Sequence, residues 1–137
     1  MAMSEPSPPI RLLNGELGMS MAQVNRFLLR HHRKSMQCLP DSSEKGQNCL
    51  FKGSKTLPLS LGGRLITQIH YHFDTDQLTQ VIGYFGSYDK SDGFKERMQQ
   101  HYGKPSQSST KQVRWHQGSQ QLLLDSASIQ LEKIPAK

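Results

Sequence analysis

Two histidines, His70 and His72, have the spacing that most suggests chemistry in this sequence. They are two residues apart in an alternating apolar and polar segment, so on a strand they would share a face, as two metal ligands do. His116 belongs to a different predicted strand. Because closed zinc sites need four ligands and catalytic ones usually three, we interpret the histidines as a polar, solvent-facing surface. We predict no metal site and no cofactor.

The acidic and hydroxyl residues also lack a catalytic pattern. Asp74 and Asp76 are close in sequence, but they fall in a predicted tight turn, where Asp is favoured for backbone reasons. The sequence contains neither a Gly-x-Ser-x-Gly motif nor a glycine-rich phosphate-binding motif. We therefore predict that the protein is not an enzyme and has no small-molecule substrate.

Charge gives a broad indication of partners. The 17 Lys and Arg residues exceed the 11 Asp and Glu residues, for a net charge of +6. This excess favours nucleic acid, anionic lipid or an acidic protein surface. The densest cluster, residues 30–34, ends a predicted helix, where positive charge complements the helix dipole. A solvated basic surface explains that cluster. Tyr84 and Phe85 near Arg64 leave a basic nucleic-acid-binding module as the alternative function.

The two cysteines, Cys38 and Cys49, flank a polar, turn-rich segment. A disulfide between them would close this loop and stabilise the fold by about 3 kcal/mol in the chain-entropy model. A disulfide favours an oxidising compartment. We therefore predict a periplasmic or otherwise exported protein whose signal or anchor is absent from this sequence, or a cytoplasmic protein if the cysteines are free. No apolar run is long enough for a transmembrane segment.

The central segment, residues 64–86, predicts a β-hairpin. Apolar and polar residues alternate on both sides of a polar turn at Thr75 and Asp76. A regular register predicts an inward row of Leu65, Ile69, Phe73, Leu78 and Ile82. It predicts an outward surface of Ile66, His70, His72, Val81 and Phe85. We predict that this outward surface is the binding site, unless the 38–49 loop or the 57–61 segment covers it.

Helices are predicted before and after this hairpin. Ser20 and Gln23 form a capping box that starts the first helix, and Gly103 ends a second helix that begins near Asp92. The last third predicts a three-stranded meander with two apolar rows, which are Val113–Leu124–Ile129 and Trp115–Leu122–Leu131.

These elements predict an α+β fold. We expect a two-layer sandwich in which an antiparallel sheet of about five to six strands carries two α-helices on one face, in the order helix, strands, helix, strands. The order also hints at a weak internal repeat. Residues 1–14 are predicted to be a flexible Pro- and Ser-rich leader, and residues 15–137 a single domain.

Two short motifs resemble known families. Leu17-Gly18-Met19-Ser20, followed by Val24, resembles the start of the first helix in the small outer-membrane lipoproteins of the SmpA/OmlA family. The segment from Phe94 through Gly103 to Pro105, followed by Trp115 and a Leu-rich hairpin, is similar to domains of the β-lactamase-inhibitor-like superfold. The resemblance covers most of residues 15–134. It implies a periplasmic, non-catalytic domain that binds other proteins through its sheet face or loops.

The predicted function is therefore that of a non-catalytic exported protein-binding domain. It would be an accessory of a cell-envelope assembly or an inhibitor-like module, and it would bind through the exposed sheet face and the loops. The predicted partner is another protein, either an envelope component or an acidic protein surface.

Overall fold

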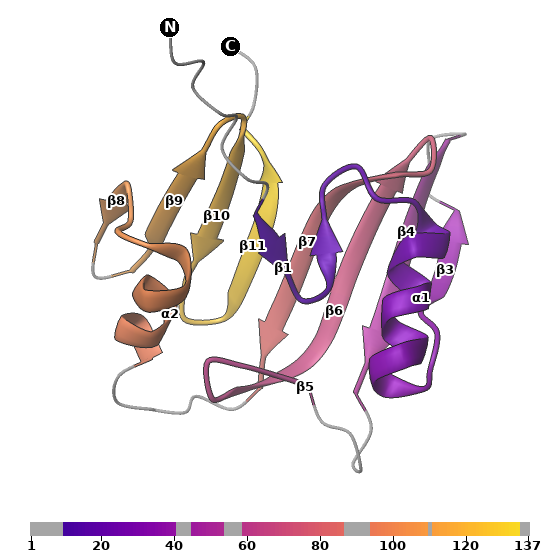
Figure 1. Ribbon diagram of the computed structural model, residues 1–137, viewed down its shortest axis with the longest axis horizontal. Coiled ribbons are helices and arrows are strands. Elements are labelled where there is room, and N and C mark those ends of the chain that lie inside the picture. The colour runs from indigo at the N-terminus through magenta and orange to yellow at the C-terminus, as the bar shows by residue number, and fades with distance from the viewer. Residues whose placement is uncertain (1–9, 41–44, 54–58, 87–93, 110, 135–137) are drawn as a thin grey trace, which may run out of the picture.

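The computed structural model describes residues 10–40, 45–53, 59–86, 94–109 and 111–134 (Figure 1). Residues 1–9 of the predicted leader and the predicted start of the second helix near Asp92 lie outside these ranges. Within them the chain forms two helices and eleven strands. The order is β1 (Arg11–Leu12), β2 (Gly15–Glu16), α1 (Met21–His32), β3 (Gln37–Pro40), β4 (Gly46–Lys52), β5 (Leu59–Leu61), β6 (Arg64–Asp74), β7 (Gln77–Phe85), α2 (Phe94–Tyr102), β8 (Gln107–Ser108), β9 (Val113–Gln117), β10 (Gln120–Leu124) and β11 (Ser128–Lys133).

The predicted fold class is wrong, because the described chain is mainly β. Nine strands form one antiparallel sheet in the order β3-β4-β6-β7-β11-β10-β9-β8, with β5 paired to β6, and β1 and β2 form a separate two-stranded sheet. The structure is therefore not a two-layer sandwich built on five to six strands. The additional strands include segments such as β3 and β8, which are too short to show an alternating apolar pattern and are held by pairing with a neighbour.

The order of strands in the large sheet supports the predicted repeat. One helix precedes β3, β4, β6 and β7, and the other precedes β8, β9, β10 and β11. From the central β7–β11 pair, the first group continues to one edge of the sheet as β6, β4 and β3, and the second continues to the other edge as β10, β9 and β8. The two halves are therefore related by an approximate two-fold arrangement, and the last strand of each half lies at the centre.

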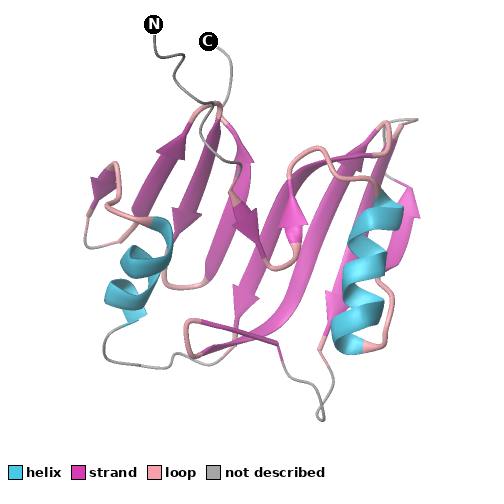
Figure 2. Cartoon of the chain, viewed as in Figure 1, coloured by secondary structure: helices cyan, strands magenta, loops and turns pink. Residues whose placement is uncertain are grey.

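Both helices lie on the same side of the large sheet (Figure 2). The capping box of α1 is present, since Gln23 N–H donates to Ser20 Oγ at 3.2 Å and Ser20 N–H donates to Gln23 Oε1 at 2.9 Å. Its buried residues are Val24 and Leu28. The second helix, α2, is joined to the sheet by Trp115, whose indole N–H donates to the carbonyl of Gly103 at 2.8 Å.

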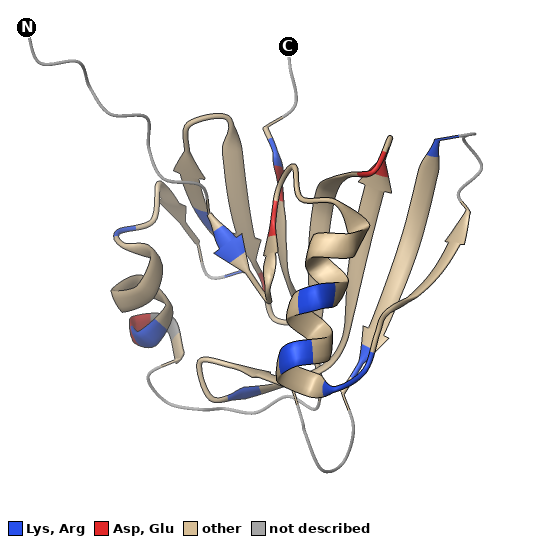
Figure 3. Ribbon diagram, turned by 45° about the vertical axis from the view of Figure 1, so that its right-hand side comes forward, with Lys and Arg blue, Asp and Glu red and all other residues tan. Residues whose placement is uncertain are grey.

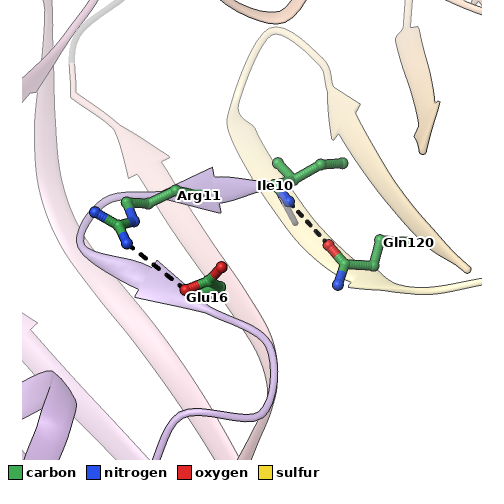
Figure 4. A network of polar contacts seen from close by, with 4 residues as sticks. All are labelled: Ile10, Arg11, Glu16 and Gln120. Atoms are coloured by element: carbon green, nitrogen blue, oxygen red, sulfur yellow. Dashed lines mark hydrogen bonds and ion pairs between the residues drawn. The ribbon is translucent and has the colours of Figure 1, made fainter. Parts of the chain in front are cut away.

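The short β1–β2 hairpin lies between the two helices on this covered side (Figure 1). The sequence predicts a flexible leader to residue 14, yet Ile10 and Leu12 are buried in the core. Gly15 lies close to the Val81 side chain, and because Gly15 has no side chain of its own, the hairpin can approach the sheet at this point. Ile10 N–H also donates to Gln120 Oε1 at 3.1 Å, which fixes the start of the hairpin to β10 (Figure 4).

Several local predictions are confirmed. In the C-terminal meander, Trp115 pairs with Leu122 and Leu122 pairs with Leu131, as the tight turns predict. Cys38 and Cys49 are directly opposite each other on β3 and β4 and form a disulfide. The disulfide favours an oxidising, exported compartment. Among the described residues, neither helix is long and apolar enough to cross a membrane.

Candidate functional site

The large sheet has two unlike faces. The covered face carries the core and the two helices. The residues that alternate with the core point to the other side, which we call the open face because none of the described helices, nor the β1–β2 hairpin, packs on it (Figures 1 and 2). Its side chains are partly buried or exposed, apart from Gln121, which is buried.

Two irregularities in the β6–β7 pairing decide which residues reach the open face. The register shifts between Ile66 and Gln68, which leaves Thr67 unpaired, and again between His72 and Phe73, which leaves Thr79 unpaired on β7. Each extra residue turns all side chains beyond it to the opposite face. Both are threonines whose hydroxyl donates to the partner strand, from Thr67 to the Tyr84 carbonyl at 3.2 Å and from Thr79 to the His72 carbonyl at 3.1 Å.

The predicted binding surface is therefore divided between the two faces. Ile66 and Phe85 do pair, but both are buried on the covered face, at 2% and 8% exposure, and Val81 is fully buried there. His70 and His72 lie on the open face as predicted, and both are partly buried. The expectation of a single outward surface made of these five residues is corrected accordingly.

Ile82 and Tyr84 take the positions that the regular register assigns to Val81 and Phe85. Both were predicted to face inward, because nothing in the alternating pattern marks the unpaired Thr79. The only local signal is a threonine at each irregularity, which is weak because threonine is common throughout β-sheets. Arg114 and His116 lie on the open face, because they alternate along β9 with Val113 and Trp115 of the two predicted apolar rows.

The strand registers arrange the open face in rows that cross the sheet. A polar row consists of Asn48, His72, Gln80, Glu132, Gln121 and His116. Glu132 is its centre, because Gln121 Nε2 donates to Glu132 Oε1 at 3.2 Å and Gln80 Nε2 lies 3.5 Å from Glu132 Oε2. These contacts hold two amides and one carboxylate in a fixed geometry across three neighbouring strands.

A mixed row lies beside the polar row. It consists of Leu50, His70, Ile82, Gln130, Leu123 and Arg114. Aliphatic side chains alternate here with polar ones, and the His70 ring contacts the Tyr84 ring edge-on at 5.2 Å between centroids. The Arg114 Nε atom is buried and has no hydrogen-bond partner among the described residues. The mixed row therefore offers apolar surface together with unused hydrogen-bonding capacity.

The histidines of the open face do not converge on one point. His72 and His116 belong to the same row, but four strand spacings separate β6 from β9, which corresponds to about 19 Å. Within the described residues, no group of three or more His, Cys, Asp or Glu side chains is placed to hold a metal ion. The arrangement suits contacts with another surface, because donors, acceptors and apolar groups are spread over six strands.

Positive charge is concentrated away from the open face. The exposed side of α1 carries Arg26 and Arg30 and has no acidic residue, and Figure 3 shows blue segments of ribbon along this helix. His32 adds little charge there at neutral pH, because burial and, secondarily, the neighbouring His31 lower its pKa. Among the described strand residues, the open face carries Lys52 and Arg114 against Asp74 and Glu132, so it is close to electrically neutral.

Comparison with known proteins places the chain in one family. The family model described as the TP0088 domain matches residues 13–132. No curated protein and no solved structure matches the chain. The match does not link the chain to the SmpA/OmlA lipoproteins or to the β-lactamase-inhibitor-like fold, so that resemblance stays a prediction.

Proposed function

We propose that this chain, which belongs to the TP0088 domain family, is a non-catalytic, exported domain that binds another protein through the open face of its large sheet. The observation that carries the proposal is the pair of rows on that face, together with Tyr84 beside His70. Aliphatic, imidazole and amide side chains are ordered there by sheet register and left uncovered by the described elements. Protein interfaces favour aromatic and apolar groups at their centre, and the mixed row with Tyr84 supplies such groups on neighbouring strands.

The size of the open face supports a protein partner. Each row crosses six neighbouring strands, in the sheet order β4, β6, β7, β11, β10 and β9. At about 4.8 Å between strands, a row spans about 24 Å. That width accommodates a helix or a pair of strands from a partner. The side chains are also well anchored, since Glu132 fixes Gln80 and Gln121, so less conformational entropy is lost on binding.

The cellular setting forms part of the proposal. The Cys38–Cys49 disulfide supports an exported protein. We place the domain in the periplasm, as an accessory of a cell-envelope assembly or as an inhibitor-like module. The near-neutral charge of the open face argues against nucleic acid there, because nucleic-acid affinity depends on cations placed against phosphates.

The experiment uses a photo-crosslinking amino acid at Tyr84, in the middle of the open face, and at His101, an exposed residue of α2, as the control position. In the native cells, Tyr84 is expected to give a discrete protein adduct that His101 does not give. An additional Ile82→Glu substitution should weaken this interaction by at least about tenfold, because it places a charge in the mixed row. A matched Gln99→Glu substitution on α2 should leave the adduct unchanged.

Two results would contradict the proposal. The first is the same adduct at both positions, or an adduct that survives the Ile82→Glu substitution. The second is an adduct at Tyr84 whose added mass is removed by nuclease, which would establish the nucleic-acid-binding alternative. Circular dichroism of each variant verifies that the fold is retained.

A further inference from the structure

A basic groove lies on the outer surface of α1, on the covered side of the molecule. It has a volume of about 260 Å³ and is lined by Gln23, Arg26, Phe27 and Arg30. A third guanidinium approaches from β1, since Arg11 Cζ is 5.8 Å from the centre of the Phe27 ring. We call this site the arginine groove. Two arginines of α1 therefore line the groove beside Phe27, and a third guanidinium from β1 lies over the Phe27 ring.

The charges of the arginine groove are poorly balanced by the residues that the structure describes. Arg11 Nη2 lies 3.6 Å from Glu16 Oε2 (Figure 4). The side chains of Arg26 and Arg30 are exposed, and neither guanidinium forms a hydrogen bond or ion pair with any residue that the structure describes. They are also four residues apart on one helix face, where like charges repel each other. An anion bound between them would remove this repulsion.

The helix dipole accounts for only part of this cluster. Arg30 lies in the last turn of α1, where a cation stabilises the helix end. Arg26 lies in the middle of the helix, beyond the reach of that effect, which fades within the last turn. Its charge therefore has no stabilising role that the described structure explains.

We propose that the arginine groove binds an acidic segment of a polypeptide, with carboxylates paired to Arg26, Arg30 and Arg11. Guanidinium groups match carboxylates in shape, and such pairs form two parallel hydrogen bonds. A groove is suited to an extended chain whose carboxylates approach the cations from two sides. This site is separate from the open face and does not depend on the proposed function.

The geometry favours an acidic polypeptide over nucleic acid or an anionic membrane. Single-stranded nucleic acid binds by stacking bases on exposed aromatic rings. The Phe27 ring is already engaged, because His31 lies parallel to it at 6.4 Å and Arg11 lies over it. A membrane surface would make contact through protruding side chains, whereas Phe27 is partly buried within a concave site.

The test measures binding of an oligoglutamate peptide to the full chain by fluorescence anisotropy, with an oligoglutamine peptide as the neutral probe. Saturable binding of oligoglutamate is expected, and it should weaken as salt is added. The double substitution Arg26→Glu and Arg30→Glu should weaken it by at least about tenfold, since it removes two charge-assisted contacts. Arg26→Lys and Arg30→Lys should restore only part of the affinity, because lysine lacks the paired donors.

The matched control is Lys104→Glu with Lys111→Glu, which makes the same change in net charge at exposed residues in the other half of the molecule. This control should retain oligoglutamate binding. Equal loss in both double variants would overturn the proposal, since it would show attraction to overall charge alone. Tighter, groove-dependent binding of a single-stranded oligonucleotide or of phosphatidylglycerol vesicles would also overturn it, in favour of that ligand.

Discussion

Tyr71 shows how one buried polar group can position a distant segment. Its side chain is almost fully buried in β6, and its hydroxyl donates to the carbonyl of Leu13 at 2.6 Å. Burial raises the pKa of the Tyr71 phenol well above its usual range, so the hydroxyl keeps its proton. This hydrogen bond fixes the turn of the β1–β2 hairpin to the middle of the sheet.

We expect Tyr71→Phe to reduce the free energy of unfolding by about 1–2 kcal/mol, because the Leu13 carbonyl loses its buried donor. Urea denaturation followed by circular dichroism measures this loss. The control is Tyr102→Phe, whose hydroxyl bonds to the Arg11 carbonyl at 3.0 Å in a more exposed setting, where burial raises its pKa to about 12. A loss from Tyr102→Phe as large as that from Tyr71→Phe would contradict this account.

Single residues also explain where prediction from sequence fails at the site. The turn at Thr75 and Asp76 and the pairing of Phe73 with Leu78 follow from local sequence, and both are present. The unpaired Thr79 does not follow, because its position depends on a hydrogen bond to His72 in the folded hairpin. That one residue moves Val81 into the core and brings Ile82 to the open face. The identity of the site residues therefore depends on tertiary structure.

At the scale of elements, strong local patterns were predictive and weak ones were not. The C-terminal meander has tight turns and alternating apolar residues, and its registers match the prediction. The strand β3 is only four residues long and ends in Pro40, so the sequence indicates the disulfide of the β3–β4 hairpin but not β3 itself. The β1–β2 hairpin is too short to show a period, and it is held by contacts with β7 that are distant in sequence.

The approach of the β1–β2 hairpin to the sheet predicts a second stability effect. A Cβ atom on Gly15 would lie 2.8 Å from Val81 Cγ2 and 3.2 Å from the Leu12 carbonyl oxygen. Gly15→Ala is therefore expected to destabilise the fold by about 1–3 kcal/mol, since overpacking outweighs the gain from a less flexible unfolded chain. In a Val81→Ala background the same substitution should be less harmful, because the contacting methyl group is absent. Additive losses in urea denaturation would contradict this packing.

At the scale of the whole molecule, the two halves share one sheet and one core. The central β7–β11 pair joins them, and buried residues from both halves form a single cluster. We therefore expect the halves to unfold together in one transition. The two halves can be perturbed and observed separately. The disulfide, which can be removed by substitution, lies in the first half, and the only tryptophan, Trp115, whose fluorescence reports unfolding, lies in the second.

Replacing both Cys38 and Cys49 by alanine is expected to lower the free energy of unfolding by about 3 kcal/mol, because the unfolded chain loses a constraint. If the sheet is one cooperative unit, the fluorescence of Trp115 should report the same shift in the urea midpoint as circular dichroism, although the change is in the other half. A shift in circular dichroism without a matching shift in Trp115 fluorescence would show two independent halves. Because the open face spans the β7–β11 junction, that result would also mean that its rows are not held rigidly for a partner.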